Sequence, residues 1–391
     1  MKKVLVVILA FVLVLSCAVV FTACGDKDEE FKVGVIHIGD PADGSGYTYA
    51  HDMGIQEMQK ELGLKDSQIV RKNSVDDQDN AASRKAMEEC VAEGCDIIFA
   101  TSFNYMNVCE ELSAKYPDVI FSHGTGYKAN ETNFNNYFGR IYQARYISGV
   151  ISGLNMTQGA NAGYVSAFTT ELAETCSGIN SFALGVQSVN PTATVYTKSL
   201  SSWFNPTNEK AFAEALLGAP YNCEVIAQHC DTANPMVAAK AAGMKGIGYN
   251  SDMSKTDAGD AVLTSVVWDW GVYYKVATKA AKDGTWADFM KDNQYYYGSY
   301  NNGMCQIIKD NLSDKDAAYV AAVEAKYADD SWDVFSGKVL SFDYDAATKT
   351  CTATDTNSPL LKNDDTATGV IDDSVIKGSM NYLIKGVVKV A

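Results

Sequence analysis

The sequence lacks most of the short motifs that accompany catalysis, phosphate binding or metal binding. It contains no G-x-S-x-G nucleophile elbow and no P-loop, and no two cysteines have C-x-x-C spacing. The histidines are not paired at the spacing of metal ligands; they are His37, His51, His123 and His229. The turn at residues 44–49 lacks the third glycine of a dinucleotide-binding fingerprint, and Tyr47 would block a pyrophosphate. We therefore expect a binding protein that is not an enzyme and uses no metal or cofactor. An enzyme is the alternative.

Positive charge is also scarce. The chain has 32 Lys and Arg against 48 Asp and Glu, which gives a formal net charge of −16 at pH 7. Nucleic-acid binding requires clustered Lys and Arg opposite phosphates, so a nucleic-acid partner is not expected. Adsorption to anionic lipid is excluded for the same reason, and any attachment to a membrane must come from a separate anchor.

One long hydrophobic run is present, and it lies at the start of the sequence. Residues 4–23 carry no charge, follow Lys2 and Lys3, and precede Cys24 and the polar run 25–30. This pattern predicts a lipoprotein signal peptide over residues 1–23, lipidation of Cys24 and a tether over residues 24–31. The body would then face outward from the cell membrane, on the extracellular or periplasmic side. The alternatives are an uncleaved membrane-spanning anchor and a second lipidation box ending at Cys17.

Eight further cysteines follow Cys24. An even number outside the cell permits disulfides, and Cys90 and Cys95 are close enough in sequence to close a small loop. The other interpretation, which we favour, is that these residues are small buried hydrophobic side chains. The eight are Cys90, Cys95, Cys109, Cys176, Cys223, Cys230, Cys305 and Cys351.

Strand and helix patterns alternate along the chain. Short β-branched runs predict strands at 32–38, 68–72, 96–100, 118–122, 162–166, 193–198, 225–229, 245–249 and 262–267. Helical periodicity is predicted at 47–62, 81–92, 104–115, 142–156, 171–189, 206–217, 235–242 and 273–282, with a final helix near 372–384. Strands separated by helices form parallel sheets. The break near residues 125–145 predicts two α/β lobes around a cleft.

Aromatic and amide-bearing residues follow the ends of these strands. In parallel α/β sheets, ligands bind beyond the carboxyl ends of the strands. Rings at these positions can stack on the faces of a flat ligand, while Asn and Asp can pair with its edge. The residues expected to bind the ligand are Tyr47, Tyr49, Phe103, Asn104, Trp203, Asp231, Asn250, Asp252 and Trp268.

Several of these strand ends occur in longer segments that resemble one protein family. The segments are 46–52, 116–121, 136–140, 202–206, 228–231, 247–252 and 267–271. Together they resemble the basic membrane protein family of substrate-binding lipoproteins, which supply purine nucleosides to ABC transporters. The resemblance covers residues 33–390. It implies a two-lobed α/β fold of the type I periplasmic-binding-protein kind, in which each lobe is a parallel sheet flanked by helices and hinge strands join the lobes.

The resemblance also implies roles for individual residues. Tyr47 and Trp203 match the aromatic residues that stack on both faces of the base. The family holds ribose with an aspartate and a lysine, and this sequence has Asn250 and Trp268 at those positions. These differences point to a free purine base, such as adenine, with Trp268 filling the ribose space. One alternative is that a nucleoside still binds, with Asn250 and Asp252 holding its sugar. Another is that the protein is a secreted enzyme acting on nucleosides. Asp231, Asn250 and Asn104 are the candidates for pairing with the ring edge.

The resemblance further implies how the chain is divided and what it binds. We expect the first lobe to comprise residues 32–141 with a return segment at 252–310. The second lobe would comprise residues 142–251 with a return segment at 311–391. The expected partners are a purine ligand and the permease subunits of an ABC importer, and the protein is expected to be a monomer.

Overall fold

The computed structural model describes residues 30–356 and 360–391. The predicted signal peptide, most of the predicted tether and the predicted lipidation at Cys24 therefore lie outside the described residues. Within the described ranges, no helix is both long enough and apolar enough to cross a membrane.

The first lobe is built on a six-stranded parallel sheet. Its strand order is β11 (Tyr295–Gly298), β5 (Phe134–Gly139), β4 (Ile120–Gly124), β3 (Ile97–Ala100), β1 (Val33–Ile36) and β2 (Ile69–Lys72). Val33 of β1 pairs with Ile69 on one side and Ile97 on the other. The strands β1 and β3 are buried on both faces, which explains their continuous apolar sequences. The helices of this lobe are α2 (Gly46–Glu61), α3 (Asn80–Ala92), α4 (Met106–Lys115), α9 (Gly271–Lys282) and α10 (Trp286–Asn293).

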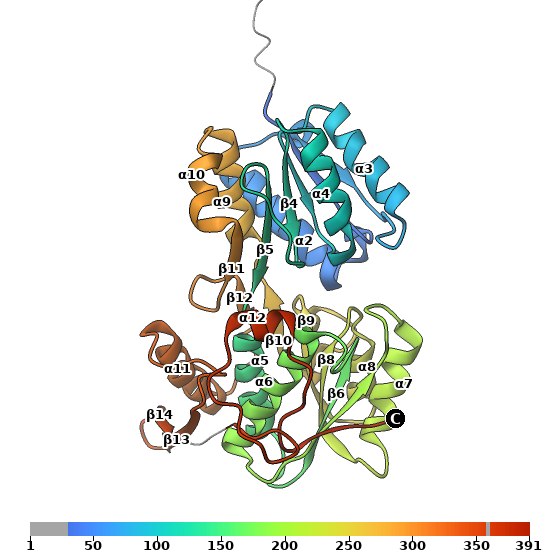
Figure 1. The fold of residues 1–391 in the computed structure, drawn as a ribbon. Helices are drawn as coiled ribbons and strands as arrows, with labels where there is room; N and C mark the ends of the chain where they lie inside the picture. The colour runs from blue at the N-terminus through green and yellow to red at the C-terminus, as the bar shows by residue number, and fades with distance from the viewer. Residues whose placement is uncertain (1–29, 357–359) are drawn as a thin grey trace, which may run out of the picture.

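The second lobe is built on a seven-stranded sheet. Its order is β12 (Cys305–Ile307), β10 (Val262–Trp268), β9 (Lys245–Asn250), β8 (Cys223–His229), β6 (Asn161–Ser166), β7 (Val195–Ser199) and β15 (Val387–Lys389). The pairing of β10 with β12 is antiparallel, and the other pairings are parallel. The helices α5 (Ile141–Leu154), α6 (Ala173–Val189), α7 (Pro206–Leu217) and α8 (Asn234–Ala241) flank this sheet. Figure 1 shows the two lobes one above the other, with β11 and β12 between them.

Two glycines allow α5 and α6 to pack in very close contact. A Cβ atom at Gly149 of α5 would lie 2.1 Å from the carbonyl oxygen of Phe182, and one at Gly185 of α6 would lie 2.0 Å from that of Tyr146. Because no side chain fits at either position, the two helix backbones can approach each other. The positions of α5 and α6 are thereby fixed relative to each other.

The predicted return segment 252–310 is only partly correct. Helices α9 and α10 and strand β11 do return to the first lobe, but β10 and β12 pair within the second sheet. The chain crosses between the sheets at residues 139–141, 268–271 and 298–305. An apolar strand such as β10 fits the interior of either sheet, so its sequence does not reveal which sheet it joins. Strand β5 was not predicted at all.

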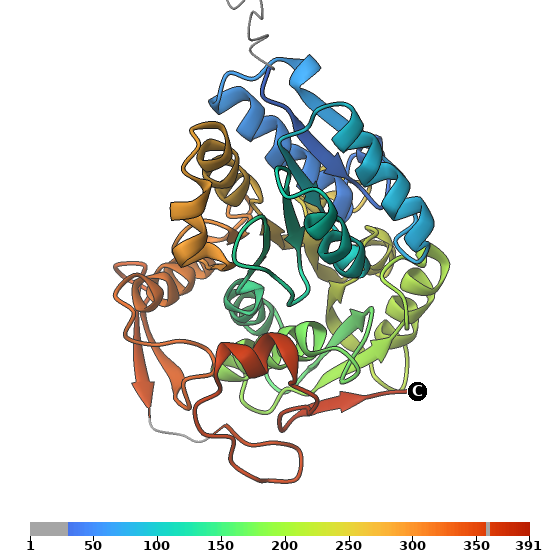
Figure 2. The ribbon, with the colours of Figure 1, turned by 45° about the horizontal axis from the view of Figure 1, so that its top comes forward.

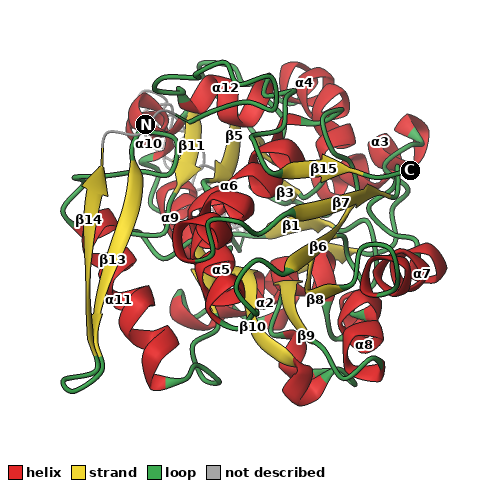
Figure 3. Cartoon of the chain, turned by 90° about the horizontal axis from the view of Figure 1, so that it is seen from below, coloured by secondary structure: helices red, strands yellow, loops and turns green. Residues whose placement is uncertain are grey.

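The C-terminal segment packs on the second lobe, as Figures 2 and 3 show. It contains α11 (Asp314–Ala328), the hairpin of β13 (Val339–Asp345) and β14 (Thr350–Thr356), α12 (Asp373–Gly378) and β15. The helix predicted over 372–384 is therefore shorter than expected. Strand β15 adds to the sheet edge by pairing with β7.

The eight cysteines of the described ranges are all free thiols. Seven are buried and Cys351 is partly exposed. Cys90 and Cys95 are not joined by a disulfide, and both side chains belong to an apolar cluster of the first lobe. This arrangement agrees with their interpretation as small hydrophobic residues.

Candidate ligand-binding site

The lobes touch where α2 begins. The backbone N–H of Gly46 donates to the hydroxyl of Ser251 in the second lobe at 3.2 Å. A Cβ atom at Gly46 would lie only 2.7 Å from the backbone oxygen of Asp231, and the residue has a φ of +83°. Glycine is therefore required here both for the backbone angle and for the close approach of the opposite lobe.

Tyr47 follows this contact and is held rigidly. Its hydroxyl donates to the carbonyl oxygen of Thr101 at 2.6 Å, and its ring meets His51 edge-on with centroids 4.4 Å apart. Burial raises the pKa of Tyr47 well above its usual value, and neighbouring acidic groups that include Glu174 and Asp231 add to this effect. Tyr47 of the first lobe thus lies close to carboxyl groups of the second.

Trp203 approaches the same acidic groups from the second lobe. The backbone N–H of Asp231 donates to the carbonyl oxygen of Trp203 at 3.0 Å. The Trp203 ring contacts Phe168 edge-on at 5.7 Å and also lies 5.9 Å from the ring of His229. Among the described residues, the rings of Tyr47 and Trp203 do not contact each other directly. The two rings come from opposite lobes, and both residues are neighbours of Asp231.

Asp231 and Asn250 form a polar pair in this region. The amide nitrogen of Asn250 donates to Oδ1 of Asp231 at 3.0 Å, while the buried Oδ1 of Asn250 has no hydrogen-bond partner within the described part of the chain. Asn250 has a φ of +66°, an uncommon conformation for a residue with a side chain. Burial, with a smaller contribution from the charge of Glu209, raises the pKa of Asp231 to about 8, although the hydrogen bond from Asn250 acts in the opposite direction.

Glu174 provides a second buried carboxyl group. It lies in the first turn of α6, and its Oε1 is 3.6 Å from Nε2 of His229. Burial raises the pKa of Glu174 to about 7, although the nearby charge of Arg145 lowers it. Burial, together with Arg145, lowers the pKa of His229 well below its usual value, so this imidazole is neutral near pH 7. The neutral ring leaves Glu174 without a cation in hydrogen-bonding contact.

Arg145 lies behind this group of residues. Its side chain is completely buried, Nη1 donates to the carbonyl oxygen of Gln228 at 2.5 Å, and the guanidinium lies 4.0 Å from the centre of the Tyr249 ring. A stacked guanidinium of this kind gains cation–π stabilisation from the ring. Arg145 therefore provides positive charge beneath the site.

Trp268 belongs to a stack of aromatic rings. It stacks on Trp270 with centroids 4.5 Å apart, and Trp270 stacks in turn on His51 at 4.1 Å. The indole N–H of Trp268 donates to the hydroxyl of Tyr249 at 3.3 Å. These contacts fix the buried Trp268 ring at the end of β10.

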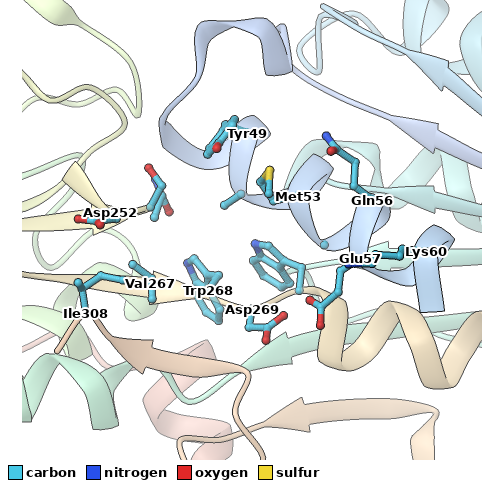
Figure 4. Close-up of a pocket in the computed structure, with 15 residues that line it drawn as sticks. Tyr49, Met53, Gln56, Glu57, Lys60, Asp252, Val267, Trp268, Asp269 and Ile308 are labelled. Atoms are coloured by element: carbon cyan, nitrogen blue, oxygen red, sulfur yellow. The ribbon is translucent and has the colours of Figure 1, made fainter. Parts of the chain in front are cut away.

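A cavity of about 630 Å³ opens beside this stack, between α2 and the ends of β9 and β10 (Figure 4). Tyr49 and Met53 lie on the α2 side, and Trp268 lies on the opposite side. Of the residues predicted from the sequence, those lining this cavity are Tyr49, Asn250, Asp252 and Trp268. Asn250 and Trp268 also form hydrogen bonds to Asp231 and Tyr249, so they connect the wall of this cavity to those two residues.

Three of the predicted residues, Asp252, Asn104 and Phe103, make no hydrogen bond or ring contact with Asp231 or Asn250 in the described part of the chain. Asp252 accepts hydrogen bonds from the backbone N–H and the hydroxyl of Ser254. Asn104 is exposed and donates to Asp77 at 3.0 Å. Phe103 is also exposed, and its ring lies 6.3 Å from that of Tyr127. The structure therefore does not bring Phe103 or Asn104 together with Asp231 and Asn250.

Sequence reasoning missed Phe168, Glu174 and Arg145. The first two follow β6, so the rule that directed attention to other strand ends would have found them. Arg145 gives a different signal, a single charge in the otherwise apolar helix α5. Within the described ranges, no group of His, Cys, Asp and Glu side chains could hold a metal ion.

The fold and the site together define a class of protein. Two α/β lobes, several crossings between them, and polar and aromatic residues from both lobes at their junction are the features of a two-lobed solute-binding protein. A solved structure with a similar fold is that of an ABC transporter solute-binding protein from Aeropyrum pernix, with a TM-score of 0.64 and 15% identity. The superposition covers 82% of this chain and 95% of the Aeropyrum pernix chain.

Sequence comparison identifies the family. Residues 31–333 match the Bmp family, described as PnrA-like ABC transporter substrate-binding proteins. The chain belongs to this family. It is 34% identical to a purine-binding protein of Brucella abortus over 92% of this chain and 93% of the relative. It is also 31% identical to a Haloferax volcanii protein whose name refers to glucose binding by an ABC transporter, over 77% of this chain and 73% of that relative. The predicted family and fold class are thus confirmed, and the family consists of solute-binding proteins rather than enzymes.

Proposed function

We propose that this protein binds a free purine base, such as adenine, between its two lobes and delivers it to the permease of an ABC importer. The ring of Tyr47 from the first lobe and that of Trp203 from the second would stack on the base. Each contact of this type contributes about 1–3 kcal/mol. The name of the Brucella abortus relative supports a purine as the ligand class.

The position of Trp268 is the observation that carries the choice of base over nucleoside. The family resemblance places a ribose-binding lysine at this position. Trp268 is instead buried, stacked on Trp270 and hydrogen-bonded to Tyr249. The neighbouring amide of Asn250 is occupied by Asp231. The rigid indole therefore occupies space that a ribose would need, and neither residue supplies a charged group for the sugar hydroxyls.

The proposed location is outside the cell membrane, with Cys24 attached to lipid. The observation behind this proposal is the apolar run 4–23 followed by Cys24 and a polar segment. A lipid anchor would hold the acidic body near the permease, since the body itself lacks the positive charge that attracts membranes.

Thermal unfolding with a panel of solutes tests the ligand. The panel contains adenine, guanine, hypoxanthine, their nucleosides, uracil, ribose and glucose. We expect free purines to raise the melting temperature most, because a ligand at 100 times its Kd stabilises by about 2.7 kcal/mol. Stabilisation by nucleosides far above the bases would contradict the role of Trp268. A rise in melting temperature with glucose, and with none of the purines, would show that the ligand is a sugar and not a purine.

The same nucleosides test the enzyme alternative. After incubation with the protein, chromatography should recover each nucleoside intact, because we infer binding without turnover. Steady release of free base by the purified protein would contradict this conclusion.

A further inference from the structure

The turn that ends α3 has a cysteine on each side. Cys90 lies in the last turn of α3, and Cys95 comes shortly before β3. Both side chains are buried, and both belong to the same apolar cluster of the first lobe. The end of a helix and the start of a strand therefore each contribute one thiol to the same part of the core.

The backbone of this turn is a Schellman motif. The N–H of Gly94 donates to the carbonyl oxygen of Val91 at 3.0 Å, and the N–H of Cys95 donates to that of Cys90 at 3.0 Å. Gly94 has a φ of +80°, the left-handed conformation that this motif requires. The longer hydrogen-bonded loop joins the two ends of the motif, and a contact between the side chains at these ends commonly accompanies it. The two ends are Cys90 and Cys95.

The neighbouring strands keep both cysteines in this position. Cys90 packs directly on β1, because a Cβ atom at Gly34 would lie 3.0 Å from its Cβ and 3.1 Å from its Sγ. The residue after Cys95 is tied to the same strand, since the backbone N–H of Asp96 donates to the carbonyl oxygen of Lys32 at 2.9 Å. Interaction with the Cys90 thiol, together with burial, raises the pKa of the Cys95 thiol above its usual value.

Other buried thiols of the described chain have contacts of a different kind. Sγ of Cys109 lies 3.9 Å from the thioether sulfur of Met87. The thiol of Cys176 donates to the carbonyl oxygen of Tyr382 at 3.1 Å. Neither contact can become covalent by oxidation, whereas two neighbouring thiols can be joined by thiol–disulfide exchange.

We propose that Cys90 and Cys95 form a modification site, a disulfide that closes a six-residue ring at the end of α3. The oxidant is an external disulfide, such as that of a thiol oxidase outside the cytoplasm. One cysteine thiolate attacks this disulfide, which releases one thiol and forms a mixed disulfide. The second cysteine thiolate then attacks the mixed disulfide, which forms the bond between Cys90 and Cys95 and releases the second thiol. The two cysteines lose two electrons and two protons, and the two released thiols carry them.

The bond forms during folding, before the core closes over both sulfur atoms. The proposed location outside the cell supplies the oxidising compartment in which such bonds persist. The inference is independent of the ligand and concerns a different part of the molecule from the inter-lobe site. Closing the ring restricts the unfolded chain, and for so short a ring we expect the melting temperature to rise by about 3 °C.

Thiol counting and peptide mapping test the proposal. The protein is exported into the oxidising periplasm of a bacterial host, and one portion is unfolded in N-ethylmaleimide while another is fully reduced first. Intact mass should show two fewer alkylated thiols in the portion that was not reduced. A protease that cuts after glutamate separates Cys90 from Cys95 at Glu93, so the bond should leave peptides 90–93 and 94–110 joined.

Cys109→Ala is the matched control, because Cys109 is buried in the same apolar cluster and belongs to peptide 94–110. This variant should keep two protected thiols and the joined peptides. In Cys95→Ala we expect every remaining thiol to be alkylated, and the melting temperature should no longer depend on reduction.

Two results for the wild type would overturn the proposal: alkylation of all its thiols without prior reduction, or peptides 90–93 and 94–110 found separate. Equal melting temperatures before and after reduction would overturn the stabilising effect of the bond. If Cys95→Ala does not fold, the peptide map of the wild type still decides. None of these outcomes bears on purine binding, so the proposed function is tested separately.

Discussion

At the scale of single residues, two substitutions relative to the family pattern explain the proposed ligand. Trp268 is fixed by stacking on Trp270 and by its hydrogen bond to Tyr249. Asn250 is buried in an uncommon backbone conformation that keeps its amide on Asp231. Both side chains are therefore part of the rigid wall of the site rather than mobile groups that could move aside for a sugar.

Restoring the family residues should restore nucleoside binding. In the double variant Trp268→Lys and Asn250→Asp, a charged pair replaces the indole and the amide. We expect the affinity for adenosine relative to adenine to rise by about tenfold, or about 1.4 kcal/mol, as measured by isothermal titration. Loss of the buried indole should cost about 3–5 kcal/mol of stability. The variant Trp268→Phe with Asn250→Asp keeps an aromatic ring and provides a milder comparison. An unchanged ratio in both variants would show that Trp268 does not exclude ribose.

At the scale of secondary-structure elements, the C-terminal helix reaches the crossing between the lobes. Arg140 lies between β5 and α5, and its Nε and Nη2 donate to Oδ2 of Asp373 at the start of α12, at 3.1 and 2.5 Å. Its Nη1 donates to the carbonyl oxygen of Tyr297 in β11 at 2.6 Å. One side chain thus connects two inter-lobe crossings with a helix that lies beyond the residues matched to the family.

Breaking this connection should destabilise the protein. Asp373→Asn removes the charge opposite Arg140, and we expect a loss of about 1–2 kcal/mol in the free energy of unfolding, measured by urea denaturation. The value is modest because about a third of each side chain is exposed. Asp365→Asn, which removes a well-exposed partner of Lys385, is the matched control and should change stability by about 0.5 kcal/mol or less. Equal effects of the two substitutions would argue against a special role for the Arg140 contact.

At the scale of the whole molecule, ligand contacts depend on both lobes being in place. Tyr47 belongs to the first lobe, whereas Trp203, Asp231 and Glu174 belong to the second. The contact between Gly46 and Ser251 joins the lobes at the start of α2. Any separation of the lobes would therefore move the Tyr47 ring away from the Trp203 ring and expose the acidic groups to water. A two-lobed receptor can in this way couple ligand binding to the shape that a permease recognises.

The attachment of the whole molecule to the membrane is testable at Cys24. In Cys24→Ser the attachment point for lipid is missing, so we expect an unprocessed precursor that remains in the membrane through the apolar run 4–23. Mass spectrometry of the wild type should find an N-terminus at Cys24 with acyl chains. Cys17→Ser changes the second candidate box and should be processed normally. A mature N-terminus elsewhere without lipid would disprove the lipoprotein assignment.

The sequence by itself determined the alternation of strands and helices and the family. These features follow from local patterns, because apolar runs, helical periodicity and strand-end residues act over short distances along the chain. The rule that ligands lie at the carboxyl ends of strands also selected Tyr47, Trp203, Asp231 and Asn250, which the structure brings to one region.

The tertiary structure decided the features that depend on distant partners. Strand β10 could have entered either sheet, and pairing with β9 and β12 placed it in the second. The fold leaves Phe103 and Asn104 exposed at the surface. The close contact of α5 and α6 at Gly149 and Gly185 fixes the helices that carry Arg145 and Glu174. A carboxyl group changes its pKa only when other elements bury it, so the chemistry of Glu174 arises from packing that no local pattern records.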